Sequence, residues 1–231
     1  NLKVIKGNIR NEIILDKLFL ESEKEDEPIE AVIHFAGLKS VSESFKKSLL
    51  YWDNNVRGTI SLLKVMEKYN CRTIVFSSSA TIYGLKNKVP LIENSSINPI
   101  NPYGRTKAVI EKILNDIYKS SCKKWKIANL RYFNPIGAHP TGLIGESPLG
   151  TPNNIFPYLT QVAVGNREKL SIFGNDWPTI DGTGIRDYIH VMDIAEGHIA
   201  ALEFLFEQDE NIVNINLGTG KGTSVLELVK T

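Results

Sequence analysis

The sequence has few cysteines, almost no net charge and no long apolar run. Cys71 and Cys122 are its only cysteines, and their wide separation favours reduced thiols in a cytoplasmic protein over a disulfide framework. The four histidines show no ligand spacing with these cysteines, so we expect no metal site. No apolar run approaches the roughly 18 residues of a membrane span. These features argue against a disulfide-rich secreted domain and against a membrane-spanning protein.

Charge and composition limit the kind of partner. The 231 residues include 27 basic and 26 acidic side chains, a net charge of +1, without a basic stripe interleaved with aromatic residues. Such a surface favours neither nucleic acid nor an anionic membrane. With 42% hydrophobic and 23% charged residues, the chain has the balance of a globular protein. We expect its partners to be small molecules or a second copy of itself.

Tyr103 and Lys107 form the clearest catalytic pattern. They lie four positions apart, so on a helix their side chains stack on one face, where an ammonium group can favour the ionised form of a phenol. This spacing often arises by chance as an exposed pair. Here it continues into Ile110, Leu114 and Ile117, which predicts that the pair faces the core. A lysine is costly to bury unless its charge is used, so we interpret the pair as a proton-transfer site.

Three serines precede this helix. The segment from Arg72 to Ser79 is interpreted as a buried parallel strand whose carboxyl end delivers hydroxyl groups to the edge where α/β sheets bind ligands. We therefore expect Ser79, Tyr103 and Lys107 to converge on one substrate oxygen.

The first half of the chain alternates between strand and helix patterns, which predicts a parallel sheet with crossover helices. Strands are expected at residues 31–35, 73–76 and 127–130, and helices at 54–69 and 103–120. We interpret Asp53 as the N-cap of the first helix and Asn70 as its end. The acidic run at residues 21–27 is expected to be a solvated loop or helix end.

The second half begins with a segment rich in glycine and proline, residues 134–157, which predicts a long irregular loop. The elements expected after it are a helix at 155–164, strands at 170–173 and 188–191, a helix at 193–207 and a strand at 212–217. Gly218 to Gly222 resembles a dinucleotide phosphate loop, but Ser224 and Glu227 fit a capping box. We interpret this segment as an ordinary turn from a strand into a helix.

Five longer segments together resemble the UDP-galactose (UDP-glucose) 4-epimerase family of the extended short-chain dehydrogenase/reductases. In chain order they are residues 34–44 (HFAGLKSVSES), 77–84 (SSSATIYG), 101–107 (NPYGRTK), 131–140 (RYFNPIGAHP) and 184–191 (GIRDYIHV). The resemblance runs from about Asn8 to the last residue. It implies an α/β fold of two domains: a Rossmann-type, doubly wound parallel sheet that binds NAD, residues 1–138, and a smaller mixed α/β UDP-sugar domain, residues 139–231. Some segments of the second domain are expected to return to the Rossmann core.

The resemblance also implies a reaction. Family members interconvert UDP-glucose and UDP-galactose in galactose metabolism by inversion at C4, through a 4-keto sugar and with tightly bound NAD. Tyr103 would take the proton from the sugar 4-hydroxyl, and Lys107 would hold the nicotinamide ribose and lower the pKa of Tyr103. Ser79 would bond the reacting oxygen and relay the proton. A homodimer formed by helices 54–69 and 103–120 is a further expectation.

Two sets of residues are assigned to ligands by the same resemblance. Those expected to contact NAD are Asn8, Ile9, Phe35, Ala36, Gly37, Lys39, Asn54, Ser77, Ser78, Tyr103, Lys107, Tyr132 and Phe133. Those expected to contact the UDP-sugar are Lys39, Ser79, Ala80, Thr81, Asn134, Asn153, Asn154, Phe173, Arg186 and Tyr188. Arg186 would grip the pyrophosphate, a task suited to a guanidinium group.

The sequence departs from the family pattern in two places. Asn8 replaces a family carboxylate at the adenine contact, and the acidic run after it is expected to be a surface insertion. The chain starts at Asn1 rather than at methionine and stops at Thr231 within a helical pattern. We therefore expect it to be a fragment, with the first strand and the glycine-rich phosphate loop before Asn1 and the carboxyl-terminal end after Thr231.

Two other functions stay open. A sugar-nucleotide 4,6-dehydratase shares the Tyr-x-x-x-Lys pattern, but it typically carries an Asp-Glu pair after the strand, where this chain has Ala80 and Thr81. A dinucleotide-binding regulatory module without catalytic activity would share the fold. Such a module needs none of Ser79, Tyr103 and Lys107, so the sequence favours the 4-epimerase.

Overall fold

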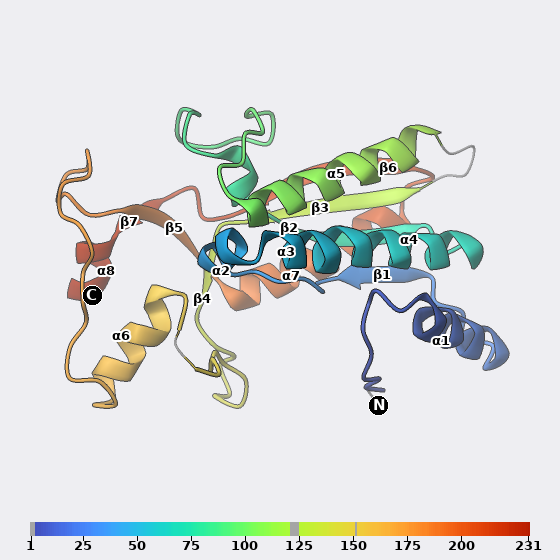
Figure 1. Ribbon diagram of the computed structural model, residues 1–231, viewed down its shortest axis with the longest axis horizontal. Coiled ribbons are helices and arrows are strands. Elements are labelled where there is room, and N and C mark those ends of the chain that lie inside the picture. Colours follow the sequence, from blue (N-terminus) through green and yellow to red (C-terminus); the bar gives the residue numbers. More distant parts are fainter. Residues whose placement is uncertain (1–2, 121–124, 151) are drawn as a thin grey trace. The chain divides into compact units, whose positions relative to one another are not determined.

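The computed structural model describes residues 3–120, 125–150 and 152–231, so Cys122 lies outside the described part. The chain divides into two compact units, and each is described by itself. The first unit contains the residues up to Arg131 together with His198–Asn216. The second contains Tyr132–Gly197 and Leu217–Thr231. Figure 1 labels the helices and strands.

The first unit is built on a four-stranded sheet with the strand order β1-β2-β3-β6. The strands are β1 (Ala31–His34), β2 (Thr73–Ser79), β3 (Lys126–Tyr132) and β6 (Asn211–Leu217). β1 pairs with β2 in parallel, from Ala31 opposite Thr73 to His34 opposite Phe76. β2 is buried along its whole length, as expected for a parallel strand covered on both faces. The predicted α/β class with a parallel sheet is confirmed.

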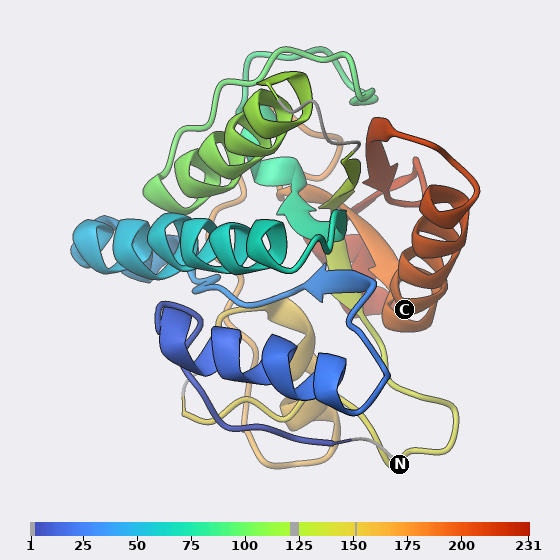
Figure 2. The same ribbon diagram turned by 90° about the vertical axis from the view of Figure 1, so that its right-hand side faces the viewer.

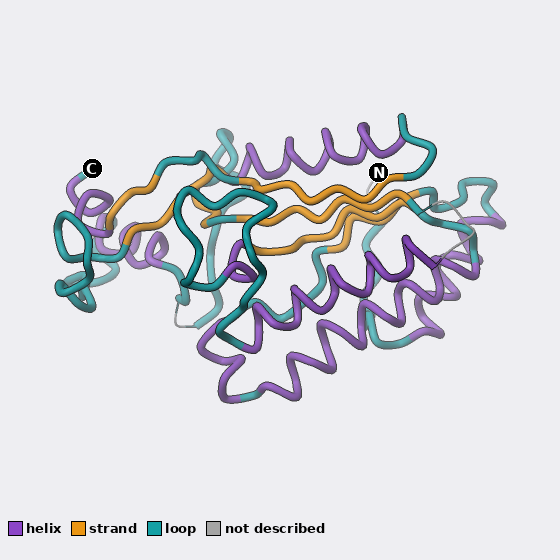
Figure 3. The backbone as a smooth tube through the Cα atoms, turned by 90° about the horizontal axis from the view of Figure 1, so that it is seen from above, coloured by secondary structure: helices purple, strands orange, loops and turns teal. Residues whose placement is uncertain are grey.

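Helices cover both faces of this sheet (Figures 2 and 3). The helical elements of the unit are α1 (Glu12–Lys24), α2 (Val41–Lys46), α3 (Ser48–Tyr51), a π-helical turn (Trp52–Arg57), α4 (Gly58–Lys68), a 3-10 helix (Ala80–Tyr83), α5 (Pro102–Ser120) and the part of α7 (Val191–Phe206) from His198 onward. α4 and α5 lie on one face, and α7 lies on the other. None of the helices in the described residues has the length and apolarity that crossing a membrane requires.

The main core of the unit lies between α1, α4, α5 and the sheet. Ile110 and Leu114 of α5 are buried there against Phe76 and Ile127. Ile117 packs against the same cluster. The stripe predicted from the spacing of α5 therefore faces the core, as its 3.6-residue period requires.

Two predictions about the helix at residues 54–69 had different outcomes. Asp53 is not an N-cap, because α3 and the π-helical turn already make the chain helical there; its carboxylate pairs instead with Arg10 and Arg57. Asn70 does end the helix, since it adopts a left-handed backbone with a φ of 58° just after α4.

The second unit contains a three-stranded sheet with the order β4-β5-β7. Its elements are β4 (Asn134–Ile136), α6 (Ile155–Ala163), β5 (Ile185–His190), the start of α7, β7 (Gly222–Ser224) and α8 (Val225–Lys230). β4 is parallel to β5, and β7 is antiparallel to it, so this sheet is mixed. The capping box predicted at Ser224 and Glu227 is present. The strand predicted at residues 170–173 is wrong, because this segment is irregular and largely exposed.

We expect Leu114→Ala to destabilise the first unit. The Leu114 side chain is fully buried, so its truncation removes apolar contacts and leaves a cavity, which typically lowers the free energy of unfolding by about 2–5 kcal/mol. Urea denaturation of the full-length protein measures the change. Leu85→Ala, at an exposed loop position of the same unit, is the control and should change it by less than about 0.5 kcal/mol. Equal effects of the two substitutions would show that α5 is not packed as described.

Candidate active site

The first turn of α5 is fixed by its capping residue and by a glycine. The Asn101 side chain accepts a hydrogen bond from the Gly104 backbone at 2.7 Å, and Pro102 occupies the first helical position. A Cβ atom at Gly104 would lie 3.0 Å from the Thr81 carbonyl oxygen. A residue without a side chain therefore lets α5 approach the segment that follows β2, and this brings Tyr103 to Ser79.

Lys107 is buried on the second turn of α5, with 4% of its surface exposed. Its Nζ donates to the Ser77 carbonyl oxygen at 2.5 Å and lies 4.8 Å from the centre of the Phe76 ring and 5.9 Å from that of Tyr103. Burial lowers the pKa of Lys107 to about 8, against the opposing effect of the Glu111 carboxylate. The ammonium group is thus held between a strand carbonyl and two aromatic rings, next to the phenol.

Burial raises the pKa of Tyr103, and a hydrogen bond with Ser79 acts in the opposite direction. The Ser79 hydroxyl also accepts hydrogen bonds from the backbone and hydroxyl of Thr81, at 3.2 and 2.9 Å. In the chain alone the phenol is therefore neutral at pH 7. Its ionisation requires positive charge beyond what these contacts supply.

The three serines at the end of β2 have different partners. Ser77 offers its carbonyl to Lys107, and Ser79 faces Tyr103. The Ser78 hydroxyl donates to Glu111 at 2.5 Å and is 1% exposed. Because this hydroxyl is enclosed, the cofactor contact predicted for Ser78 would have to come from its backbone.

A cavity of about 440 Å³ in the first unit gathers five of the residues predicted to contact NAD. It is lined by the predicted residues Asn8, Ile9, Ala36, Gly37 and Asn54, together with Ile5, Gly7, Ile14, Leu15, Leu18 and Leu38. Apolar walls with a few amide groups suit a nucleoside. The residues therefore fit the adenosine part of NAD. The Asn8 amide oxygen already accepts two hydrogen bonds from Arg10, so the amide nitrogen is the group of Asn8 left to meet a base.

Asn55 shapes this cavity but was missed in the sequence. Its amide exchanges two hydrogen bonds with the Leu38 backbone, at 2.8 and 3.0 Å, and donates to Thr106 at 3.1 Å. A Cβ atom at Gly37 would lie 3.2 Å from its Oδ1. Asn55 and Thr59 are polar residues four positions apart on the buried side of the helical segment. Polar residues in a stripe that should be apolar are the sequence signal that could have identified Asn55.

The histidines of the described residues have structural partners. His34 is bonded to Thr59 at 2.8 Å, and burial lowers its pKa to about 3, so it is neutral. His198 lies against Phe35, with ring centres 4.6 Å apart, while Phe35 and Lys39 are otherwise exposed. No group of three or more metal-ligating side chains occurs within the described ranges.

The residues predicted to bind the UDP-sugar from the later segments belong to the second unit. Asn134 and Tyr188 are neighbours across the β4 and β5 pair. Arg186 lies on the same strand as Tyr188, is exposed, and bonds the Ile185 carbonyl oxygen. The remaining ones, Asn153, Asn154 and Phe173, are also exposed. Their assignment to the substrate stays a prediction.

Tyr132 and Phe133, predicted to flank the nicotinamide, begin the second unit. The Phe133 backbone donates to the Leu217 carbonyl oxygen at 3.0 Å. A Cβ atom at Gly218 would lie 2.8 Å from the Phe133 ring, so the glycine makes room for it. Phe133 is thus anchored beside the turn that follows β6.

That turn holds a carboxylate of the protein itself. Asp187 accepts hydrogen bonds from the backbone N–H groups of Thr219 and Gly220, at 2.9 and 2.8 Å, and from the Thr219 hydroxyl. The backbone groups that resemble a phosphate loop therefore bind Asp187, as expected for a structural turn.

The chain matches the model of the NAD dependent epimerase/dehydratase family over residues 1–218. It is 56% identical over 222 residues to UDP-glucose 4-epimerase 2 of Arabidopsis thaliana, which covers 96% of this chain and 62% of that protein. It is 55% identical over 230 residues to a UDP-glucose 4-epimerase of Cyamopsis tetragonoloba, covering 100% and 64%. The chain thus spans about three fifths of the length of the curated relatives it matches.

Solved structures are similar over the whole chain. UDP-glucose 4-epimerase of Bifidobacterium longum, in complex with NAD+ and UDP, has a TM-score of 0.92 and 46% identity over 100% of this chain and 67% of that one. The family model and the relatives agree with the pairing of Tyr103 and the buried Lys107 on α5. The chain belongs to the NAD dependent epimerase/dehydratase family.

Proposed function

We propose that the complete protein is a UDP-glucose 4-epimerase that interconverts UDP-glucose and UDP-galactose. The observation that carries the proposal is the convergence of Ser79, Tyr103 and Lys107 at the carboxyl end of β2. The curated relatives named UDP-glucose 4-epimerase, and the structure of one with NAD+ and UDP, support this substrate.

The chain's own residues would move the proton. NAD would supply hydride transfer at C4 of the sugar, and Asn8, Gly37 and Asn54 would help to hold it in the cavity of the first unit. Tyr103 accepts the proton of the 4-hydroxyl, and Ser79, which already bonds Tyr103, holds the same oxygen in place. Lys107 keeps a positive charge beside the phenol and favours its ionised form.

Residues of the second unit would bind the UDP part of the substrate. Arg186 presents an exposed guanidinium group, the residue type suited to a pyrophosphate. Asn134 and Tyr188 lie side by side on neighbouring strands and offer amide and phenol groups to the sugar nucleotide. Asn153, Asn154 and Phe173 complete the proposed set.

The reaction is tested by incubating the full-length protein with UDP-galactose and separating the products. We expect UDP-glucose, formed without added NAD if the cofactor stays bound. A 4-keto-6-deoxy sugar would instead show the dehydratase alternative, which the sequence disfavours because Ala80 and Thr81 offer no carboxylate. No turnover by protein that contains NAD would support the regulatory alternative. A parallel incubation with UDP-N-acetylgalactosamine defines the range of sugars accepted.

We expect Tyr103→Phe to lower kcat by at least about 100-fold while NAD stays bound, because general acid–base catalysis typically contributes this much. Phenylalanine keeps the ring beside Lys107 but removes the hydroxyl that Ser79 bonds. Steady-state kinetics and the NAD content of the purified variant measure both effects. Tyr118→Phe, on the same helix, is the control and should keep its activity. Unchanged turnover in Tyr103→Phe would disprove the proton-transfer role.

We expect Lys107→Met to abolish epimerisation and yet stabilise the fold near pH 7. The pKa of Lys107 is about 8 in the folded chain and 10.5 unfolded, so the unfolded state binds more protons between these values. The unfolding free energy of the natural protein therefore rises with pH across this window. The gain in Lys107→Met should be on the order of 1–3 kcal/mol at pH 7 and shrink towards pH 10.

Urea denaturation at several pH values, with the NAD content of each sample determined, measures this dependence. Lys112→Met removes an exposed ammonium group from the same helix and is the control. A constant difference between pH 7 and pH 10 would contradict the burial of a charged Lys107.

We further propose that the protein is a cytoplasmic homodimer. Exposed apolar side chains at Leu49, Leu50 and Ile60 line α3 and α4 and support a second copy as the partner. Light scattering of the full-length protein should give twice the monomer mass, and Ile60→Glu should shift it towards the monomer. Leu85→Glu, at an exposed loop position, is the control. A monomeric natural protein would refute the dimer.

A further inference from the structure

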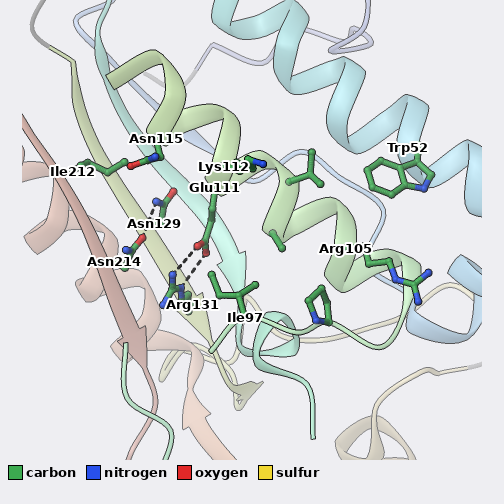
Figure 4. A pocket seen from close by; sticks show the side chains of 13 residues that line it. Trp52, Ile97, Arg105, Glu111, Lys112, Asn115, Asn129, Arg131, Ile212 and Asn214 are labelled. Atoms are coloured by element: carbon green, nitrogen blue, oxygen red, sulfur yellow. Dashed lines mark hydrogen bonds and ion pairs between the residues drawn. The ribbon is translucent and has the colours of Figure 1, made fainter. Parts of the chain in front are cut away.

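A buried ion pair lies one helical turn beyond Lys107. Arg131 of β3 and Glu111 of α5 are 2% and 6% exposed at their side chains. Two parallel hydrogen bonds join them, at 2.7 Å from Nη2 to Oε2 and 3.1 Å from Nε to Oε1. Figure 4 shows the pair in direct contact, and both residues belong to the lining of a cavity of about 610 Å³ beside α5. Burying two charges is costly even when they pair, so the pair calls for a reason beyond stability.

The pair belongs to a larger network within the first unit. Arg131 also donates to the Tyr83 hydroxyl at 2.9 Å and to the Glu93 carbonyl oxygen at 2.8 Å. Tyr83 in turn donates to Asn216 of β6 at 2.6 Å. The guanidinium group thus uses all three of its nitrogens, and its direction is set by three separate segments.

The network meets the catalytic residues along one face of α5 and at the end of β2. Along α5, Tyr103, Lys107 and Glu111 are spaced four residues apart and so occupy one face. Along β2, their partners are the consecutive residues Ser79, Ser77 and Ser78, with Ser78 donating to Glu111. Three contacts therefore fix the place of α5 on β2, and the ion pair anchors the one made by Glu111.

We propose that Glu111 and Arg131 are positioning residues for the reaction. By bonding α5 to β2 and β3, they fix the position of α5 along the strands so that Tyr103 and Lys107 lie next to Ser79 and Ser77. This inference rests on the proposed function. It assigns the pair no contact with sugar or cofactor. A misplacement of about 1 Å at reacting groups can lower a rate by about 100-fold, so a small slip of the helix is enough to matter.

Glu111 also has an electrostatic effect on Lys107. The charged or titratable groups that interact with Lys107 are Tyr103 and Glu111 on its own helix and His34 from β1; Arg131 of β3 is bound to Glu111. His34 is neutral above its pKa of about 3, and Arg131 is paired, which leaves Glu111 to raise the pKa of Lys107. Glu111 thus acts through the length of its side chain on the position of α5 and through its charge on the pKa of Lys107. Substitutions that change only one of these properties separate the two effects.

Two substitutions in the full-length holoenzyme test the proposal. Glu111→Asp keeps the charge but is one methylene shorter, so it cannot hold both Ser78 and Arg131; kcat should fall about ten-fold or more, with KM for UDP-galactose within about two-fold. Glu111→Gln keeps the length but loses the charge. The pKa of Lys107 should then fall, and the alkaline limb of the kcat profile should move to lower pH by about one unit. Asp116→Asn, on the exposed side of the same helix, should change neither quantity.

A readout independent of turnover separates this proposal from the proposed function. The free energy of unfolding is measured against pH for each Glu111 variant with and without Lys107→Met, and the difference between the two curves is the contribution of Lys107. The pH at which this contribution changes should be lower in Glu111→Gln and unaltered in Glu111→Asp. A natural protein that does not epimerise would refute the function, and the unfolding measurement would still decide the link between Glu111 and Lys107. Normal kcat in Glu111→Asp, or a loss that only follows lost NAD or a lowered melting temperature, would overturn the positioning role.

Discussion

The close packing of α5 against the end of β2 organises the candidate site of the first unit, and it encloses the ammonium group of Lys107 away from water. A buried cation needs partners on every side, and here they are the Ser77 carbonyl and the faces of Phe76 and Tyr103. These contacts form only where α5 lies close to the end of β2, and a glycine at position 104 allows that approach. A side chain at this position would meet the Thr81 carbonyl oxygen.

Features that repeat along one element could be predicted from the sequence. The period of α5 placed Tyr103 and Lys107 on the buried stripe with Ile110 and Leu114, because helical periodicity is a local property of the chain. The roles assigned to individual site residues came from the five segments that together resemble the 4-epimerase family. The resemblance therefore predicted what each site residue does, and the helical period predicted that the face of α5 carrying Lys107 is buried.

What the sequence could not give depends on distant partners. The cap expected at Asp53 failed because contacts elsewhere keep the preceding residues helical, and the strand expected at residues 170–173 failed because apolar residues alone do not create a neighbouring strand. Asn55 was overlooked because its partner Leu38 is 17 residues away. The pairing of Glu111 with Arg131 could not be foreseen either, because it depends on β3 lying beside α5.

Short motifs show the same dependence on context. Backbone N–H groups in a glycine-rich turn attract any anion of suitable shape. Here the anion is the Asp187 carboxylate on a neighbouring strand, so the turn serves to hold β5, the strand that carries Arg186 and Tyr188. A loop that binds phosphate and a turn that binds a carboxylate of its own chain can thus share one sequence pattern.

The π-helical turn Trp52–Arg57 limits how this region can change in evolution. Its hydrogen bonds span one residue more than those of an α-helix, and it carries Asn54 at the cavity wall and Asn55 at Leu38. Deleting one residue would restore the regular helix and rotate the two asparagines by about 100° relative to α4. Natural variation in length is therefore expected to avoid this turn and to accumulate in segments such as the acidic end of α1.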